Sequence, residues 1–165
     1  MNIYQQIEAE IKAASNIVIT SHKSADGDSI GSSLGLLHFI EKLGKTATVC
    51  HPDPAPKFLD WLDTSAFLLM TEQPEAITTA FAAADLVFCL DYNATKRVGS
   101  DMQALLEAVT CKTVMIDHHL NPEPFPTLTL SETTASSTSE LIVELIEQSG
   151  NGNLLDQKIG TPLYL

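Results

Sequence analysis

The sequence predicts an α/β domain with a doubly wound, mainly parallel sheet and helices on both faces. Short runs of continuous apolar residues alternate with longer segments of helical apolar spacing, which is typical of parallel strands covered on both faces. Ionisable residues directly follow several of these apolar runs. Because the carboxyl ends of parallel strands meet at one crevice, we expect these residues to converge.

The elements follow one another in the order that this fold requires. From apolar spacing we expect helices over residues 3–14, 29–43, 74–84, 102–109 and 140–146, and a helical turn or two over 58–62. We expect buried strands over residues 17–20, 46–50, 85–90 and 112–116, and an edge strand over 127–130. Ser136 or Ser137 is a suitable N-cap for the last helix.

Composition limits the class of protein. The 165 residues and 44% apolar content fit one domain with a hydrophobic core. No apolar run approaches the roughly 20 residues of a membrane-spanning helix, and the N-terminal segment is too polar for a signal peptide. The three cysteines lack CxxC spacing and indicate buried thiols in a reducing cytoplasm. A net charge of −12 argues against binding long duplex nucleic acid but does not exclude a phosphate substrate.

The first polar cluster follows the strand expected at residues 17–20. It contains His22, Asp26 and Asp28. An imidazole and two carboxylates favour Mn²⁺, Mg²⁺ or Fe²⁺ over metals that prefer thiolates. The alternative is structural, because Asp26 and Asp28 could form a turn and an N-cap for the helix that follows. On these residues alone, both interpretations stay open.

Two further clusters also follow apolar strands. Asp91 comes directly after residues 85–90 and is either a ligand or a loop cap. Asp117, His118 and His119 follow residues 112–116. One histidine could bind metal and the other a phosphate oxygen, with the aspartate orienting a ring, although a plain polar loop is the alternative.

Lys96 and Arg97 lie shortly after the second of these strands and are candidate phosphate anchors. Arg can contact phosphate through two parallel hydrogen bonds. The alternative is an exposed, solvated pair of cations.

These clusters together resemble the DHH phosphoesterase family, named for its Asp-His-His motif. The first family motif, HxxxDxDxxGS, matches residues 22–32, the second resembles Asp91 after LVFCL, and the third is residues 117–119 after TVMI. A fourth, Ser/Thr-rich segment resembles residues 134–138. Within this family, the sequence is most similar to the bacterial oligoribonuclease and 3′-phosphoadenosine-5′-phosphate (pAp) phosphatase group, in the segments SADGDSIGSSLGL and IDHHLNP.

The resemblance implies a pair of Mn²⁺ ions, with Mg²⁺ or another divalent ion as a substitute. In the family's arrangement, His22, Asp26 and Asp91 would hold one ion. Asp28, Asp91 and His118 would hold the other, with Asp91 bridging the two. The implied reaction is phosphoester hydrolysis by a metal-bridging water whose pKa both ions lower.

The resemblance also implies catalytic and substrate-binding roles. His119 would contact phosphate and Asp117 would orient it. Ser32 in the first motif and Ser136 in the fourth segment are further substrate-binding candidates, beside the two cations. The implied substrates are short RNA oligonucleotides or pAp, and a homodimer is an open option.

Residues 163–165 look like the beginning of a strand that precedes a further ligand Asp in family members. The resemblance therefore predicts that residues 1–165 are a DHH catalytic domain truncated at its C-terminal end, without the DHH-associated substrate domain. Alternatives within the same chemistry are a cyclic-dinucleotide phosphodiesterase, an exopolyphosphatase and a pyrophosphatase. An alternative of another class is a non-catalytic, Rossmann-like nucleotide-binding module.

Overall fold

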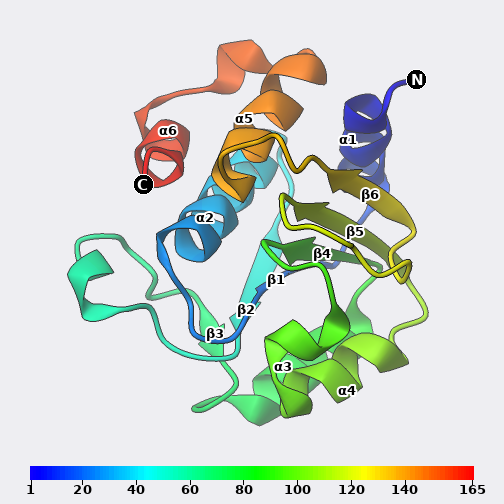
Figure 1. Cartoon of the computed structure of the whole chain (residues 1–165), viewed down its shortest axis with the longest axis vertical. Helices are drawn as coiled ribbons and strands as arrows, with labels where there is room; N and C mark the ends of the chain where they lie inside the picture. The colour runs from blue at the N-terminus through cyan, green and yellow to red at the C-terminus, as the bar shows by residue number, and fades with distance from the viewer.

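The computed structural model describes residues 1–165, arranged as a sheet between two layers of helices (Figure 1). The helices are α1 (Ile3–Ala13), α2 (Gly27–Lys42), α3 (Pro74–Ala83), α4 (Ser100–Ala108), α5 (Thr138–Gln148) and α6 (Gln157–Leu163). The strands are β1 (Ile17–Ser21), β2 (Ala47–His51), β3 (Leu68–Leu69), β4 (Leu86–Leu90), β5 (Lys112–Asp117) and β6 (Leu128–Ser131). Short 3-10 helices are η1 (Lys57–Leu59), η2 (Thr95–Val98) and η3 (Gly152–Leu154).

The strands form one six-stranded parallel sheet in the order β3-β2-β1-β4-β5-β6. From β1 the chain winds outward to β3, crosses back to β4 beside β1, and winds outward again to β6. The direction of winding therefore reverses between β1 and β4, and this is where open α/β sheets bind ligands. The predicted doubly wound, parallel fold is confirmed, and β6 is the expected edge strand.

Alternating strand residues supply the two faces of the sheet. Ile17 and Ile19 of β1 belong to the larger hydrophobic cluster, which they share with α1, α2, α5 and α6. Val18 between them belongs to the smaller cluster, which it shares with α3 and α4. The same division of helices is visible on the two sides of the sheet in Figure 1. Both faces are thus buried, which explains why the strands are apolar throughout.

Two elements differ from the sequence prediction. The prediction that a strand begins at residues 163–165 is wrong, because the helix α6 occupies Gln157–Leu163 and no strand follows it within the chain. The Asp156 side chain caps this helix by accepting from the Ile159 N–H at 3.1 Å. Ile159, Pro162 and Leu163 are buried at helical spacing. The two-residue strand β3 was not predicted, since it follows a proline-rich loop and pairs only with the end of β2.

Helices α2 and α6 pack very closely. A Cβ on Gly31 would lie 2.3 Å from the Pro162 carbonyl oxygen, and one on Gly35 would lie 2.3 Å from Leu163 Cδ2. Position 31 therefore needs glycine for the approach of α6, because a Cβ there would meet backbone, whereas at position 35 a Cβ would meet only the Leu163 side chain. The helix that carries this motif is thus fixed in place by packing on its far side.

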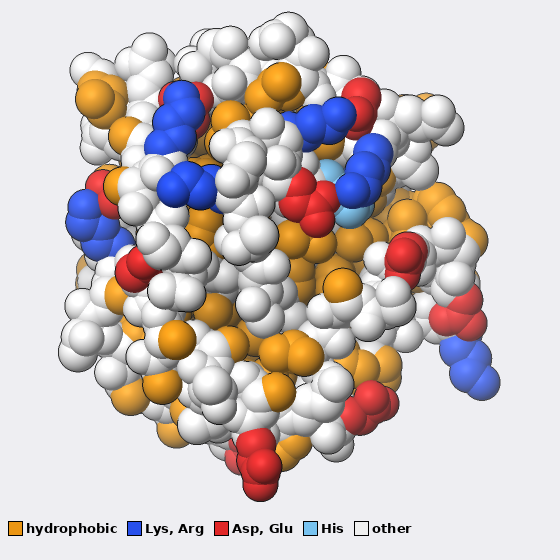
Figure 2. All heavy atoms as spheres, turned by 180° about the vertical axis from the view of Figure 1, so that it is seen from behind, with side chains coloured by type: hydrophobic (Ala, Val, Ile, Leu, Met, Phe, Trp, Pro, Cys, Tyr) orange, Lys and Arg blue, Asp and Glu red, His pale blue; other side chains and the backbone are white.

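The helices, the surface charges and the cysteines can be compared with what the composition predicts. None of the helices has the length and apolar character needed to cross a membrane. On the face shown in Figure 2, most Lys and Arg side chains stand beside Asp or Glu, without one continuous basic area. The cysteines are free: Cys50 and Cys89 are buried as expected, whereas Cys111 is only partly buried.

Candidate metal centre

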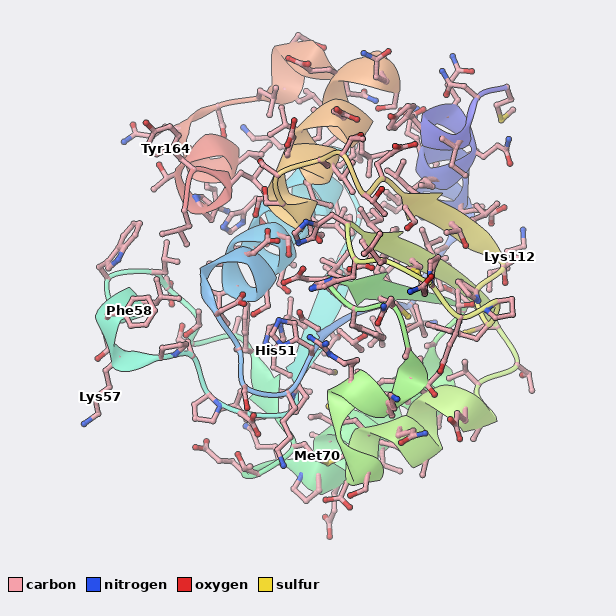
Figure 3. The ribbon with its side chains drawn as sticks, viewed as in Figure 1. His51, Lys57, Phe58, Met70, Lys112 and Tyr164 are labelled. Atoms are coloured by element: carbon pink, nitrogen blue, oxygen red, sulfur yellow. The ribbon has the colours of Figure 1, made fainter.

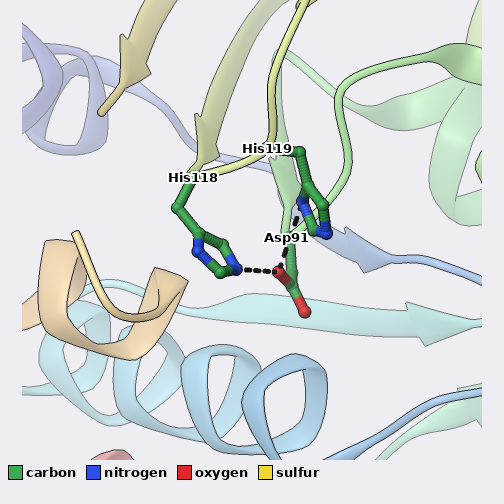
Figure 4. Close-up of side chains that lie close together, drawn as sticks. All are labelled: Asp91, His118 and His119. Atoms are coloured by element: carbon green, nitrogen blue, oxygen red, sulfur yellow. Dashed lines mark ion pairs between the residues drawn. The ribbon is translucent and has the colours of Figure 1, made fainter. Parts of the chain in front are cut away.

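The candidate site lies at the carboxyl edge of the sheet, where the direction of winding reverses. His22 follows β1, Asp91 follows β4 and His118 follows the end of β5. The structure brings these three residues together with Asp26 and Asp28 from the start of α2. Figure 4 shows Asp91 between His118 and His119. Clusters that are far apart in the sequence therefore meet at one place, as the topology requires.

The ring of His22 is held in a defined orientation. Its Nδ1 lies 2.8 Å from the Lys23 carbonyl oxygen, which can only accept, so Nδ1 carries the proton. In the neutral ring, Nε2 then presents a lone pair to Asp91 Oδ2 at 3.2 Å and to Asp26 Oδ2 at 3.7 Å. A lone pair facing two carboxylates is favourable only with a cation among them, either a proton on Nε2 or a metal ion.

Asp91 joins the two halves of the site. Oδ2 faces His22, whereas Oδ1 lies 3.5 Å from His118 Nε2 and accepts a hydrogen bond from the Thr138 hydroxyl at 3.1 Å. The backbone of Asp91 is left-handed, with φ of 63°, and its N–H donates to the Ile116 carbonyl at 3.0 Å. A non-glycine residue in this conformation is strained, and such strain concentrates at functional sites.

Burial and neighbouring charges shift the pKa values of this pair. Burial raises the pKa of Asp91, the hydrogen bond from His22 opposes that rise, and the Asp28 charge adds to it, so the pKa ends above its ordinary value. Burial lowers the pKa of His22, but its hydrogen bonds with Asp91 and Lys23 and the nearby carboxylate charges raise it overall. Both shifts show that the site concentrates negative charge in a space with little water.

The two carboxylates of the first cluster face the site and also cap helices. Asp26 is the N-cap of α2, because its Oδ1 accepts from the Ser29 N–H at 3.0 Å while Oδ2 faces His22. Asp28 accepts from the Thr138 and Ser139 N–H groups of α5, both at 2.8 Å. Its Oδ2 also lies 3.6 Å from His118 Nε2. The capping and ligand interpretations are therefore compatible, since each carboxylate has an oxygen directed at the centre.

Asp117 holds His119 rather than the centre itself. Asp117 Oδ1 is 2.6 Å from His119 Nδ1, and its Oδ2 accepts from the His119 backbone N–H at 3.0 Å. A carboxylate only accepts, so Nδ1 carries a proton and Nε2 remains for another partner. Asp117 is fully buried, whereas the His119 side chain is 36% exposed and reaches solvent.

The donor set fits a divalent cation. Neighbouring ligands of an octahedral ion with bonds of about 2.1 Å stand about 3 Å apart, near the separations measured here. The potential ligand atoms of His22, Asp26 and Asp91 all lie within 4.8 Å of one another, as do those of Asp91, His118 and His119. Oxygen and imidazole ligands without thiolate suit Mn²⁺, Mg²⁺ or Fe²⁺.

Comparison with known proteins agrees with this geometry. Residues 16–165 match the DHH family, N-terminal domain. The chain belongs to the DHH family. The cyclic-di-AMP phosphodiesterase PdeA of Listeria monocytogenes is 28% identical over 154 residues, which cover 88% of this chain and 23% of PdeA. The bifunctional oligoribonuclease and PAP phosphatase NrnA of Thermus thermophilus is 29% identical over 134 residues, which cover 81% of this chain and 37% of NrnA.

Solved structures extend the comparison. An exopolyphosphatase-related protein from Bacteroides fragilis superposes with a TM-score of 0.94 at 37% identity, covering 98% of this chain and 48% of that protein. RecJ from Thermus thermophilus in complex with Mn²⁺ has a TM-score of 0.50 at 18% identity, covering 91% of this chain and 22% of RecJ, which is a likeness of fold alone. This DHH domain spans less than half the length of these relatives. The predicted family is confirmed, and the relatives named above include a phosphodiesterase and an oligoribonuclease and phosphatase, which are phosphoester hydrolases.

The predicted substrate-binding residues of this DHH domain lie in different surroundings. Lys96 and Arg97 are exposed on η2, next to the site strand, and the Arg97 carbonyl accepts from the Lys23 N–H at 2.8 Å. Ser136 is exposed, and its hydroxyl donates to Glu140 at 2.7 Å. Ser32 is fully buried and donates to the Ser29 carbonyl within α2 at 3.4 Å, so its hydroxyl offers no surface to a substrate.

Two further residues complete the description. Thr138, which contacts both Asp91 and Asp28, was not singled out, because a Ser/Thr-rich segment does not reveal which hydroxyl points inward. The available signals were its place at the start of an amphipathic helix and inside the segment that resembles the fourth family motif. His51, labelled in Figure 3, is fully buried at the carboxyl end of β2 and belongs to neither candidate ligand group, and its Nε2 hydrogen bonds with the Ser33 hydroxyl at 2.9 Å.

Proposed function

We propose that this DHH domain is the catalytic part of a Mn²⁺-dependent phosphoesterase that hydrolyses short RNA oligonucleotides, pAp, or both. One observation carries the proposal: the two oxygens of Asp91 face two different groups of ligands. His22 lies on the Oδ2 side and His118 on the Oδ1 side. A single buried carboxylate placed in this way is suited to bridge two cations.

The ligand sets follow from that division. His22, Asp26 and Asp91 would hold one ion, and Asp28, Asp91 and His118 would hold the other. Divalent ions bound there would supply charge stabilisation at phosphorus and a water of lowered pKa as nucleophile. Both sets consist of carboxylate and imidazole groups, which is the class of ligand that Mn²⁺ accepts.

The remaining residues act on the substrate. Asp117 fixes the proton on His119 Nδ1, which leaves Nε2 of this partly exposed ring to contact a phosphate oxygen. A proton on Nε2 as well would let the ring donate to the charge that develops on phosphate. Lys96 and Arg97 form no ion pair with any residue of the chain and are free to bind further phosphates.

The class of substrate follows from charge and from relatives. NrnA of Thermus thermophilus is named as an oligoribonuclease and PAP phosphatase, which supports small, anionic nucleotide substrates here. The net charge of −12 supports a short footprint rather than long nucleic acid. The free thiols support a reducing, cytoplasmic setting.

A metal titration tests the centre without requiring turnover. We expect Mn²⁺ to raise the melting temperature of the wild-type chain, since at one hundred times Kd a ligand adds about 2.7 kcal/mol to the free energy of unfolding. Asp26→Ala, Asp91→Ala and His118→Ala should abolish this shift. Asp60→Ala is the matched control, because Asp60 is exposed on the loop after η1 and lies outside both ligand sets. Absence of Mn²⁺ binding by the wild type would overturn the proposal.

The substrate is tested separately by a panel containing pAp, an RNA dinucleotide, cyclic di-AMP and pyrophosphate, each with Mn²⁺. Fastest hydrolysis of pAp or the dinucleotide supports the proposal. Fastest hydrolysis of cyclic di-AMP, the substrate in the name of PdeA, would replace the proposed substrate while leaving the metal centre in place. Preference for pyrophosphate would do the same.

A further inference from the structure

Helix α5 begins against the metal centre. Thr138, its first residue, is fully buried. Its hydroxyl donates to Asp91 Oδ1 at 3.1 Å and its backbone N–H donates to Asp28 Oδ2 at 2.8 Å. One residue therefore touches two of the proposed ligands, and it reaches both from a helix that supplies no ligand.

The contact with Asp91 fixes an oxygen that nothing else holds at hydrogen-bond distance. On the other side of the carboxylate, His22 Nε2 lies 3.2 Å from Oδ2. On the Oδ1 side, the nearest histidine nitrogens, of His118 and His119, lie 3.5 and 3.9 Å away. Without the threonine hydroxyl, the carboxylate would be free to rotate away from the His118 side.

The position of Thr138 is itself well determined. Ser137 caps α5 by accepting from the Glu140 N–H at 3.0 Å. Leu141, Ile142, Leu145 and Ile146 are buried in the larger hydrophobic cluster. A group on a packed helix holds its partner more precisely than one on a loop.

We infer that Thr138 is a positioning residue of the metal centre, which orients Asp91 through its hydroxyl and Asp28 through its backbone N–H. This inference rests on the proposed function. Removing a group that orients a metal ligand typically lowers metal affinity or activity by 10 to 100-fold. We therefore expect loss of the hydroxyl to weaken Mn²⁺ binding by about tenfold.

Three variants separate this role from a purely structural one. Thr138→Val removes the hydroxyl and keeps the shape and the backbone N–H, whereas Thr138→Ser keeps the hydroxyl. Ser137→Ala removes the helix cap but touches neither carboxylate. Mn²⁺ affinity is measured by calorimetry on each folded chain, and the melting temperature without metal is measured alongside it.

We expect T138V to bind Mn²⁺ about tenfold more weakly than the wild type, with T138S close to the wild type. S137A should lower the melting temperature and leave Mn²⁺ affinity unchanged. Equal affinity of T138V and wild type would overturn this inference and leave the proposed function standing. A loss of affinity in S137A equal to that in T138V would also overturn it, since helix stability would then explain both. No Mn²⁺ binding by the wild type would overturn the proposed function and the inference together.

Discussion

Asp117 accepts two hydrogen bonds from His119, one from the ring Nδ1 at 2.6 Å and one from the backbone N–H at 3.0 Å. The ring is therefore fixed in both orientation and tautomer, although the side chain is partly exposed. Asp117 makes these contacts from a fully buried position at the end of β5. The second histidine of the motif is thus held from behind by Asp117, with its Nδ1 3.9 Å from Asp91 Oδ1.

Asp117→Asn should lower kcat without lowering metal affinity. An amide accepts through only one of its two polar atoms and so holds the His119 ring less firmly, and we expect kcat for the best substrate of the panel to fall about 100-fold. Mn²⁺ affinity, measured by calorimetry, should stay within about twofold of the wild type, since Asp117 belongs to neither proposed ligand set. A parallel loss of Mn²⁺ affinity would contradict this division of roles.

Gly31→Ala should destabilise the protein more than Gly35→Ala. An added Cβ meets a backbone oxygen of Pro162 at position 31 but a side chain, Leu163, at position 35. Leucine can change rotamer, whereas the backbone of α6 must move, which costs about 1–3 kcal/mol. Both changes gain about 1 kcal/mol of helix propensity, so G35A should be nearly neutral.

Urea denaturation of the two glycine variants measures the difference in the free energy of unfolding. Equal midpoints would show that α6 moves away from α2 without loss, and that the close packing is not needed for stability.

The strand ends were predictable because burial and chemistry change at the same residue. LVFCL followed by Asp91, and TVMI followed by Asp117, mark both a buried strand and the edge where it stops. The reversal of winding was not predictable in detail, since no local pattern states which strands are neighbours. The contacts of Thr138 with Asp91 and Asp28 were not predictable either, because they depend on how α5 packs on α2 in the folded chain.

The prediction for the segment that forms α6 failed for a different reason. The resemblance to family members favoured a strand beginning at residues 163–165, yet Asp156 and the spacing of Ile159, Pro162 and Leu163 are typical of a capped amphipathic helix. The helical signal was therefore present in the sequence, in the N-cap and in the spacing of the apolar residues.

His51 should make stability depend on pH below neutrality. Burial, together with the charge on His22, lowers the pKa of His51 from 6.5 to about 3. The unfolded chain binds a proton at His51 below pH 6.5, whereas the folded chain does not until about pH 3. Its contribution to stability is thus fully present above pH 6.5 and is lost as pH falls toward 3, with a slope of up to about 1.4 kcal/mol per pH unit.

His51→Gln removes this titration and retains an amide that can reach the Ser33 hydroxyl. Urea denaturation between pH 6.5 and 4 should give a shallower loss of stability for H51Q than for the wild type. An unchanged slope would mean that His51 takes up its proton in the folded state as readily as in the unfolded one.

Asp91→Asn should stabilise the metal-free protein while abolishing its response to Mn²⁺. Burial and the Asp28 charge raise the pKa of Asp91, so ionising this carboxyl costs more free energy in the folded chain than in the unfolded one. Asparagine carries no charge, its oxygen can accept from Thr138, and its NH₂ can donate to the His22 Nε2 lone pair. We expect the free energy of unfolding without metal to rise by about 1 kcal/mol.

Asp91→Ala is the comparison that separates charge from hydrogen bonding. Alanine also removes the charge, but it leaves the buried Thr138 hydroxyl and the His22 ring without their partner, so D91A should be less stable than D91N by about 1–3 kcal/mol. Thermal melting with and without Mn²⁺ measures both effects in one experiment. A metal-free D91N less stable than the wild type would show that the ionised carboxylate stabilises the fold, and that the site is not strained by its own charge.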